Sequence, residues 1–147
     1  MKFTQTAIPD VVVIEPPVFG DARGWFMESF NQPKFMAGLA ELGLPAPRPF
    51  LQDNHSCSQA GVLRGLHFQR APHAQGKLVR VTKGRAFDVA VCIPAGPAPL
   101  GEWGGGGLRA GEKKQTLLAE GVLSGVLAPV IENPLPFEKT EGYSTEC

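Results

Sequence analysis

An arginine and a histidine stand three positions apart in the segment Gly61–Gln69, which reads GVLRGLHFQ. The apolar residues around them favour a half-buried β-strand, so Arg64 and His67 need a reason to be there. A buried arginine requires an anionic or carbonyl partner, because an unpaired charge away from water is costly. A histidine side chain can take or give a proton near neutral pH. The segment therefore predicts a site that holds a phosphate or carbonyl group and moves a proton.

The bulk composition fits one globular domain spanning residues 1–147. Apolar residues make up 43% of the chain and charged residues 19%, both ordinary for such a domain. Lys and Arg number 14, as do Asp and Glu, so the formal net charge is zero. This balance gives no global field that would attract nucleic acid or a membrane surface. We expect neither as a partner.

The cysteines and the N-terminus point to the cytoplasm. Three widely spaced cysteines, Cys57, Cys92 and Cys147, form no CxxC pair, so neither a disulfide framework nor a zinc knuckle is predicted. Reduced thiols are typical of cytoplasmic proteins. The first residues, MKFTQTAIPDVVVIEP, do not resemble a secretory signal. No apolar run approaches the roughly 20 residues of a membrane-spanning helix.

Many short strands and one helix are expected. Apolar residues at helical spacing, with Pro33 near the start, predict a helix over Asn31–Leu42. The glycine run Gly104–Gly107 suggests a turn or a disturbed strand. Strand spacings near ten residues with turn signals between them favour an all-β sandwich or barrel. The predicted strands are Val11–Glu15, Trp25–Phe30, Phe50–Ser58, Val62–Gln69, Lys77–Thr82, Arg85–Ile93, Gly101–Leu108, Gln115–Leu118 and Val122–Val130.

Several ordered motifs together resemble one family. They are DARGWFME from Asp21, QDNHS from Gln52, GVLRGLHFQ from Gly61, QGKLVRVTKG from Gln75 and DVAV from Asp88. In this order they are similar to the dTDP-4-dehydrorhamnose 3,5-epimerase family, densely over residues 8–93 and more weakly to residue 121. The resemblance implies a cupin-type jelly-roll barrel with one or two short helices, and a homodimer.

The resemblance also implies a reaction. A dTDP-4-keto-6-deoxyhexose is epimerised at carbons 3 and 5, as in dTDP-L-rhamnose biosynthesis. The ketone at carbon 4 acidifies the neighbouring protons, so a base can remove each one and an acid can return it on the opposite face. This chemistry needs a base, a cation near the enolate oxygen and an acid, and we expect no redox cofactor and no metal.

The resemblance assigns roles to individual residues. His67 corresponds to the general base, and Lys77 to a lysine beside the sugar ketone. Arg64 corresponds to a residue that contacts the diphosphate, for which its planar fork is suited. Taken alone, His67 could equally be a structural core histidine, and Lys77 would more often be a solvated lysine at a strand end. The further expected substrate-binding residues are Phe19, Arg23, Glu28, Gln52, Asn54 and Tyr143, with Tyr143 stacking on the thymine; Asp88 is expected to be structural.

The C-terminal third departs from the family pattern. Ser124 stands where the family has a substrate-binding histidine, and Phe137 falls on the position of the catalytic tyrosine. A register shifted by one would place Glu138 there instead. The chain stops at Cys147, before the region that supplies an aspartate partner to the base. Three hypotheses stay open: an enzyme with altered scope, such as a 3-epimerase; a barrel that only binds the nucleotide sugar; and a sequence incomplete at its C-terminus.

A metal-dependent cupin is a further alternative. Such sites use a His-x-His pair with an additional Glu and His. The equivalent segment here is His67-Phe68-Gln69, and the remaining histidines, His55 and His73, lie apart from it in sequence. The sequence therefore favours a site without metal.

Overall fold

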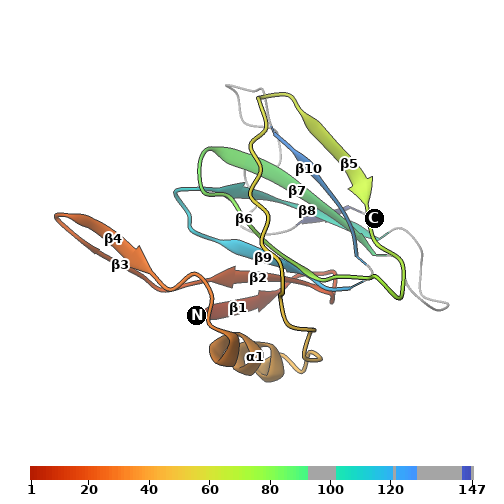
Figure 1. Cartoon of the computed structure of the whole chain (residues 1–147), viewed down its shortest axis with the longest axis horizontal. Helices are drawn as coiled ribbons and strands as arrows, with labels where there is room; N and C mark the ends of the chain where they lie inside the picture. Colours follow the sequence, from red (N-terminus) through yellow and green to blue (C-terminus); the bar gives the residue numbers. More distant parts are fainter. Residues whose placement is uncertain (93–101, 121, 129–143, 147) are drawn as a thin grey trace.

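Two antiparallel β-sheets, a protruding hairpin and one helix make up the part of the chain that the computed structural model describes, residues 1–92, 102–120, 122–128 and 144–146 (Figure 1). The four-stranded sheet has the order β1 (Lys2–Gln5), β2 (Val11–Glu15), β9 (Gln115–Leu118), β6 (Lys77–Arg80). The five-stranded sheet has the order β11 (Ser144–Glu146), β8 (Trp103–Arg109), β7 (Arg85–Cys92), β10 (Val122–Leu127), β5 (Leu63–His67). The hairpin consists of β3 (Val18–Asp21) and β4 (Gly24–Met27), and the helix is α1 (Gln32–Glu41).

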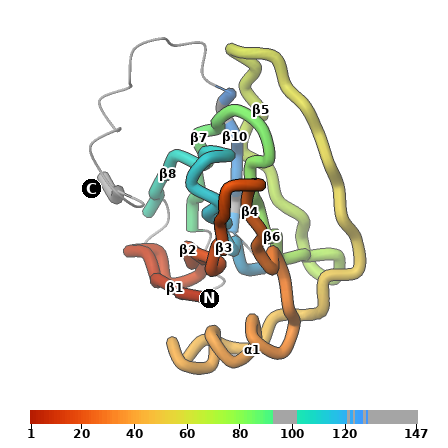
Figure 2. Tube along the Cα trace, turned by 90° about the vertical axis from the view of Figure 1, so that its left-hand side faces the viewer, coloured from red at the N-terminus to blue at the C-terminus, as the bar shows by residue number. Residues whose placement is uncertain are grey.

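The elements form three layers, with α1 below the four-stranded sheet and the five-stranded sheet above it (Figure 2). One hydrophobic cluster joins the two sheets and comprises Ile8, Val11, Ala90, Leu118 and Val122. A second cluster, the outer cluster, lies between the four-stranded sheet and α1 and comprises Val12, Ile14, Phe35, Leu39 and Leu117. Because β2 is covered on both faces, its sequence VVVIE is a continuous apolar run instead of an alternating one.

Helix α1 begins where the sequence predicts it. The Asn31 side chain accepts a hydrogen bond from the backbone nitrogen of Lys34 at 3.2 Å, and Pro33 occupies the first turn, where no backbone donor is needed. Phe35 and Leu39 project from one face into the outer cluster. The predicted helix over Asn31–Leu42 is therefore confirmed, within one residue at each end.

Replacing Asn31 by alanine is expected to lower the free energy of unfolding by about 1 kcal/mol, because the N-cap hydrogen bond is lost. Urea denaturation followed by circular dichroism measures this change. Asn31→Ser is the matched control, since serine also caps helices and should retain most of the stability. Equal losses in the two variants would show that the cap contributes nothing.

One strand prediction is wrong, and so is the turn or disturbed strand suggested for Gly104–Gly107. Residues 50–58 form no strand; they run as an extended connection from α1 towards β5 (Figure 1), and their sequence is mostly polar. The glycine run Gly104–Gly107 lies inside β8, fully paired with β7. The reason is spatial: a Cβ on Gly105 would lie 2.6 Å from the Phe87 ring, so glycine makes room for a phenylalanine on the adjacent strand.

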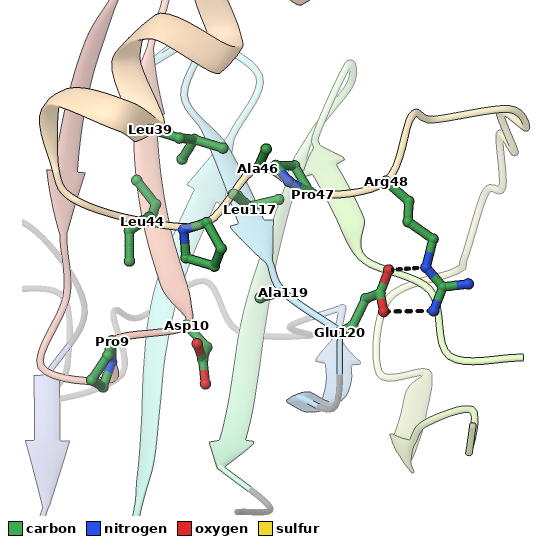
Figure 3. A pocket seen from close by; sticks show the side chains of 12 residues that line it. Pro9, Asp10, Leu39, Leu44, Ala46, Pro47, Arg48, Leu117, Ala119 and Glu120 are labelled. Atoms are coloured by element: carbon green, nitrogen blue, oxygen red, sulfur yellow. Dashed lines mark hydrogen bonds and ion pairs between the residues drawn. The ribbon is translucent and has the colours of Figure 1, made fainter. Parts of the chain in front are cut away.

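A hollow on the outer side of the four-stranded sheet is closed at one end by an ion pair (Figure 3). Nε and Nη2 of Arg48 each lie 2.8 Å from one carboxylate oxygen of Glu120. This fork fixes the proline-containing segment that follows α1 against the end of β9. The hollow is lined by Leu39 and Leu117 of the outer cluster. It lies on the face of the sheet that points away from the five-stranded sheet.

The expectation of an all-β fold with a helix is confirmed by these elements. Jelly-roll folds are built from two such antiparallel sheets. Within the described residues the sheets do not close on each other, because β5 and β6 are edge strands of separate sheets.

Candidate active site

An irregularity in the pairing of β5 with β10 puts Arg64 and His67 on one face of the sheet. His67 pairs with Ser124, and Arg64 pairs with Val126. The two β5 residues are three positions apart, whereas their partners are two apart, so β5 contains one extra residue, a β-bulge. Without it, residues three apart would point to opposite faces. The sequence signal for this bulge was the isolated Gly65 inside a strand.

The shared face is the inner one. Ser124 and Val126 pair on their other side with Ala90 and Asp88 of β7, both buried between the sheets. The expectation that His67 faces the interior is met by this register. The expectation of a half-buried strand is wrong, because all five residues of β5 are exposed, with Leu63 at 69%. As an edge strand, β5 is covered by no further strand of the described chain.

Lys77 reaches this face from the opposite sheet. It lies on β6 and shares a strand face with Val79, which packs against the cluster between the sheets. Its Nζ lies 3.3 Å from Nε2 of His67 and donates a hydrogen bond of 3.0 Å to Oγ of Ser124. The edges of both sheets thus bring a base and a cation together, ten positions apart in sequence.

Burial is the main influence on the charge of Lys77. Desolvation lowers the pKa of the Lys77 ammonium, and the negative charge of buried Asp88 offsets part of this by raising the same pKa. A half-buried ammonium is less screened by water than an exposed one and acts more strongly on a developing negative charge. Lys77 is therefore suited to stabilise an enolate.

Ser124 is a site residue whose function the sequence left open. Its side chain is 4% exposed, and its hydroxyl accepts the hydrogen bond from Lys77. The sequence showed only that a serine replaces the family's histidine at this position. The structure adds that the serine oxygen accepts a hydrogen bond from the half-buried ammonium.

Replacing Ser124 by alanine is therefore expected to lower the pKa of Lys77 further, because a hydrogen bond to the charged form is lost. The alkaline limb of the kcat/KM profile should move to lower pH, while the rate at neutral pH falls less than in variants of Lys77 itself. A pH–rate series on both proteins measures the shift. Coincident limbs would remove Ser124 from the environment of Lys77.

The other expected substrate-binding residues of the two sheets and the segment before β5 are exposed. Nε and Nη2 of Arg64 donate to Oγ of Ser58 at 3.2 and 3.0 Å, which leaves the guanidinium at the surface beside the site. Gln52 donates to the side-chain oxygen of Asn54 at 3.1 Å. Neither contact buries its partners, so all three side chains remain accessible to a ligand.

The structure does not bring the hairpin residues to His67 in the same chain. Strands β3 and β4 extend away from both sheets, on the side opposite β5 (Figure 1). Phe19 is 64% exposed, and Arg23 forms a forked ion pair with Asp21 at the hairpin turn. Glu28, just after the hairpin, accepts hydrogen bonds from Asn31 at 2.7 Å and Lys34 at 2.6 Å at the start of α1.

Tyr143, Phe137 and Glu138 lie outside the described residues. In the described part, no three His, Cys, Asp or Glu side chains gather closely enough to hold a metal ion, and no helix is long and apolar enough to cross a membrane. The expectation of a site without metal or cofactor remains a prediction.

The fold and the site define a jelly-roll protein equipped for proton transfer beside a carbonyl group. The sequence pattern of the family described as dTDP-4-dehydrorhamnose 3,5-epimerase matches residues 5–147. The chain belongs to this family.

Individual relatives support this family membership. The dTDP-4-dehydrorhamnose 3,5-epimerase of Shigella flexneri is 46% identical over 144 residues, which are 98% of this chain and 77% of the relative. The crystal structure of the Elizabethkingia anophelis enzyme matches with a TM-score of 0.77 at 41% identity, covering 88% of this chain and 68% of that one. A 3,5-epimerase from Legionella pneumophila, solved with dTDP-4-keto-L-rhamnose, gives 0.76 at 41% identity, covering 87% and 65%. These neighbours confirm the jelly-roll fold.

Proposed function

We propose that this chain epimerises a dTDP-4-keto-6-deoxyhexose at carbons 3 and 5, as a step in the formation of dTDP-L-rhamnose. The observation that carries the proposal is the contact between Lys77 and His67 on the inner face, 3.3 Å apart. It supplies a base and an enolate-stabilising cation side by side. Family membership and the ligand of the Legionella pneumophila relative support the choice of sugar.

The proposed step at each carbon is a proton transfer with no net oxidation. His67 takes the proton from the carbon beside the ketone, and the electron pair of the broken C–H bond moves to the ketone oxygen as an enolate. Lys77 stabilises that oxygen by charge and hydrogen bonding. Return of a proton to the opposite face of the same carbon completes the inversion. The donor of that proton is unassigned, because Phe137, at the family's tyrosine position, has no hydroxyl group.

We also propose that Arg64, Gln52 and Asn54 hold the nucleotide. Their exposed polar groups lie on β5 and on the segment that leads to it. The guanidinium of Arg64 fits paired diphosphate oxygens. The negative charge of the diphosphate would thereby anchor the substrate with its ketone towards Lys77. The thymine would stack on Tyr143.

A second candidate, inversion at carbon 3 alone, is favoured by Ser124 and Phe137. Ser124 replaces a histidine with which the family binds the sugar, and Phe137 replaces the tyrosine with which it protonates the sugar. Loss of these two groups would then impair inversion at carbon 5. If neither carbon is inverted, the protein is a barrel that binds the nucleotide sugar without catalysis.

Product analysis distinguishes these candidates. The protein is incubated with dTDP-4-keto-6-deoxyglucose, the ketone is reduced with borohydride, and the hydrolysed sugars are separated. Inversion at both carbons yields L-rhamnose and its carbon-4 epimer, and this is the expected result. Inversion at carbon 3 alone yields 6-deoxy-D-allose and its carbon-4 epimer. Only 6-deoxy-D-glucose and 6-deoxy-D-galactose, as in a sample without protein, would overturn the proposal of an epimerase.

We further propose a cytoplasmic homodimer in which each hairpin serves the site of the partner chain. The hairpin carries two expected binding residues, Phe19 and Arg23, away from His67 of its own chain. It also exposes Trp25 at 56% and Phe26 at 69%, more apolar surface than an isolated hairpin keeps in water without cost. A second copy, related by a two-fold axis, would cover this surface and receive the arginine.

Mixing two inactive variants tests the shared site. His67→Ala and Arg23→Ala are unfolded together and refolded as a mixture. In a mixed dimer, one site would combine His67 of one chain with Arg23 of the other, so random pairing should restore about a quarter of the wild-type activity. No recovery, with dimers present by light scattering, would place Arg23 outside the partner's site. A monomer in light scattering would contradict the dimer itself.

A further inference from the structure

We propose that Gly125 is a positioning residue: it allows the bulge of β5 to close onto β10, and the carbonyl of Gly65 in that bulge fixes the imidazole of His67 with its proton on Nδ1. This inference rests on the proposed function only for its effect on rate. Its structural content, the orientation and protonated nitrogen of His67, can be measured without turnover.

The backbone of the bulge lies directly over Gly125. A Cβ at this position would stand 2.9 Å from the carbonyl oxygen of Arg64, 3.1 Å from the nitrogen of Leu66 and 3.2 Å from the carbonyl carbon of Gly65. All three are main-chain atoms, so no flexible side chain can move aside. Any residue other than glycine must push β5 away from β10. Gly125 stands between Ser124 and Val126, the pairing partners of His67 and Arg64.

The bulge also supplies the partner of the histidine. Nδ1 of His67 lies 2.9 Å from the carbonyl oxygen of Gly65, an atom that can only accept a hydrogen bond. Nδ1 must therefore carry the proton. On the other side of the ring, Nε2 faces the Lys77 ammonium at 3.3 Å, and an ammonium can only donate. Both contacts are satisfied by a single neutral tautomer, which has a proton on Nδ1 and none on Nε2.

The bare nitrogen is the one that reaches the site. With Nδ1 committed to Gly65, Nε2 is the atom available to take a proton on the inner face, beside Lys77. The bond on one ring nitrogen selects the state of the other. One backbone irregularity thus does three things: it turns Arg64 and His67 to the same face, orients the imidazole and leaves its basic nitrogen towards the ketone.

The protonated nitrogen of His67 is measured by nitrogen-15 NMR of histidine-labelled protein, at a pH where the imidazole is neutral. The His67 signals are assigned by their absence from His67→Ala. We expect the wild type to show a protonated Nδ1 and a bare Nε2, although free imidazole side chains in water favour the opposite tautomer. A protonated Nε2 in the wild type would overturn the inference, whatever the activity of the protein.

Gly125→Ala tests the positioning function. We expect His67 to lose the Nδ1 tautomer and kcat to fall about 100-fold, as for a reacting group displaced by about 1 Å. The matched control is Gly107→Ala on β8 of the same sheet, where a Cβ meets no atom within 4 Å; tautomer and kcat should stay as in the wild type. A folded Gly125→Ala protein with the wild-type tautomer and rate would overturn the inference. If that variant does not fold, the wild-type tautomer decides.

Discussion

Replacement of His67 by alanine is expected to abolish epimerisation while the nucleotide still binds. The imidazole is the group that faces Lys77 on the inner side of the sheet. Removing a general base costs about 10²–10⁴-fold in rate, and here a single base serves both carbons. We therefore expect kcat to fall about 10⁴-fold, the upper end of that range. The dissociation constant of dTDP, measured by calorimetry, should change little, because Arg64 and its neighbours are untouched.

The control for this prediction is His73→Ala. His73 is exposed in the loop before β6. Its replacement should leave kcat unchanged. Wild-type turnover by the His67→Ala protein would remove His67 from the mechanism, and an equal loss in both variants would point to a general effect on the fold.

Replacement of Lys77 by methionine is expected to lower kcat about 10²–10³-fold, with a smaller change in KM. The loss of one donor aimed at a developing oxyanion typically has this size. Methionine keeps the length of the side chain and removes the charge. Because the cation matters most when the enolate has formed, the loss should appear in kcat. A variant that changed only KM would make Lys77 an anchor for the substrate.

The pH dependence of the wild type adds an independent test of Lys77. Burial lowers the pKa of its ammonium, so the charged form is present at low and neutral pH and is lost at a lower pH than for an exposed lysine. The enolate then loses its cation, and kcat/KM should fall on the alkaline side earlier than the titration of an ordinary lysine would allow. Lys77→Arg should remove this limb, since guanidinium stays charged.

The matched control for Lys77→Met is Lys83→Met, which removes an exposed lysine from the turn between β6 and β7. Its rate and pH profile should match the wild type. An alkaline limb that persisted unchanged in Lys77→Arg would belong to another group and would contradict the function assigned to Lys77.

The sequence predicts the parts of this fold that depend on local patterns. The helix has a cap, a proline in its first turn and apolar residues at helical spacing, all in agreement, and its position is correct. Strand β2 is covered on both faces, so its apolar run marks it at the observed bounds, and β9 is also found at its predicted bounds. The strand predicted over residues 50–58 is absent because this mostly polar segment has no neighbouring strand to pair with in the described structure. The turn or disturbed strand suggested for the glycine run of β8 is wrong because the need for glycine at Gly105 comes from a tertiary contact with Phe87, which the local sequence does not show.

The sequence indicates candidate site residues but not their arrangement in space. His67, Lys77 and Arg64 were singled out by residue type and motif. Arg64 and His67 share a face because β5 has one extra residue, and this bulge is visible only in the pairing of β5 with β10. The function of Ser124 required the contact with Lys77 across two sheets. The distance of Phe19 and Arg23 from His67 follows from the direction of a hairpin, which its own sequence does not encode.

The most direct test of the central claim, proton abstraction beside the ketone by His67 with Lys77, is exchange into solvent. Proton NMR follows dTDP-4-keto-6-deoxyglucose with the wild-type protein in heavy water. We predict that the signals of the protons at carbons 3 and 5 disappear as deuterium replaces them, and that both persist with the His67→Ala protein. Both signals persisting with wild-type protein, while the sugar nucleotide is bound, would contradict the account.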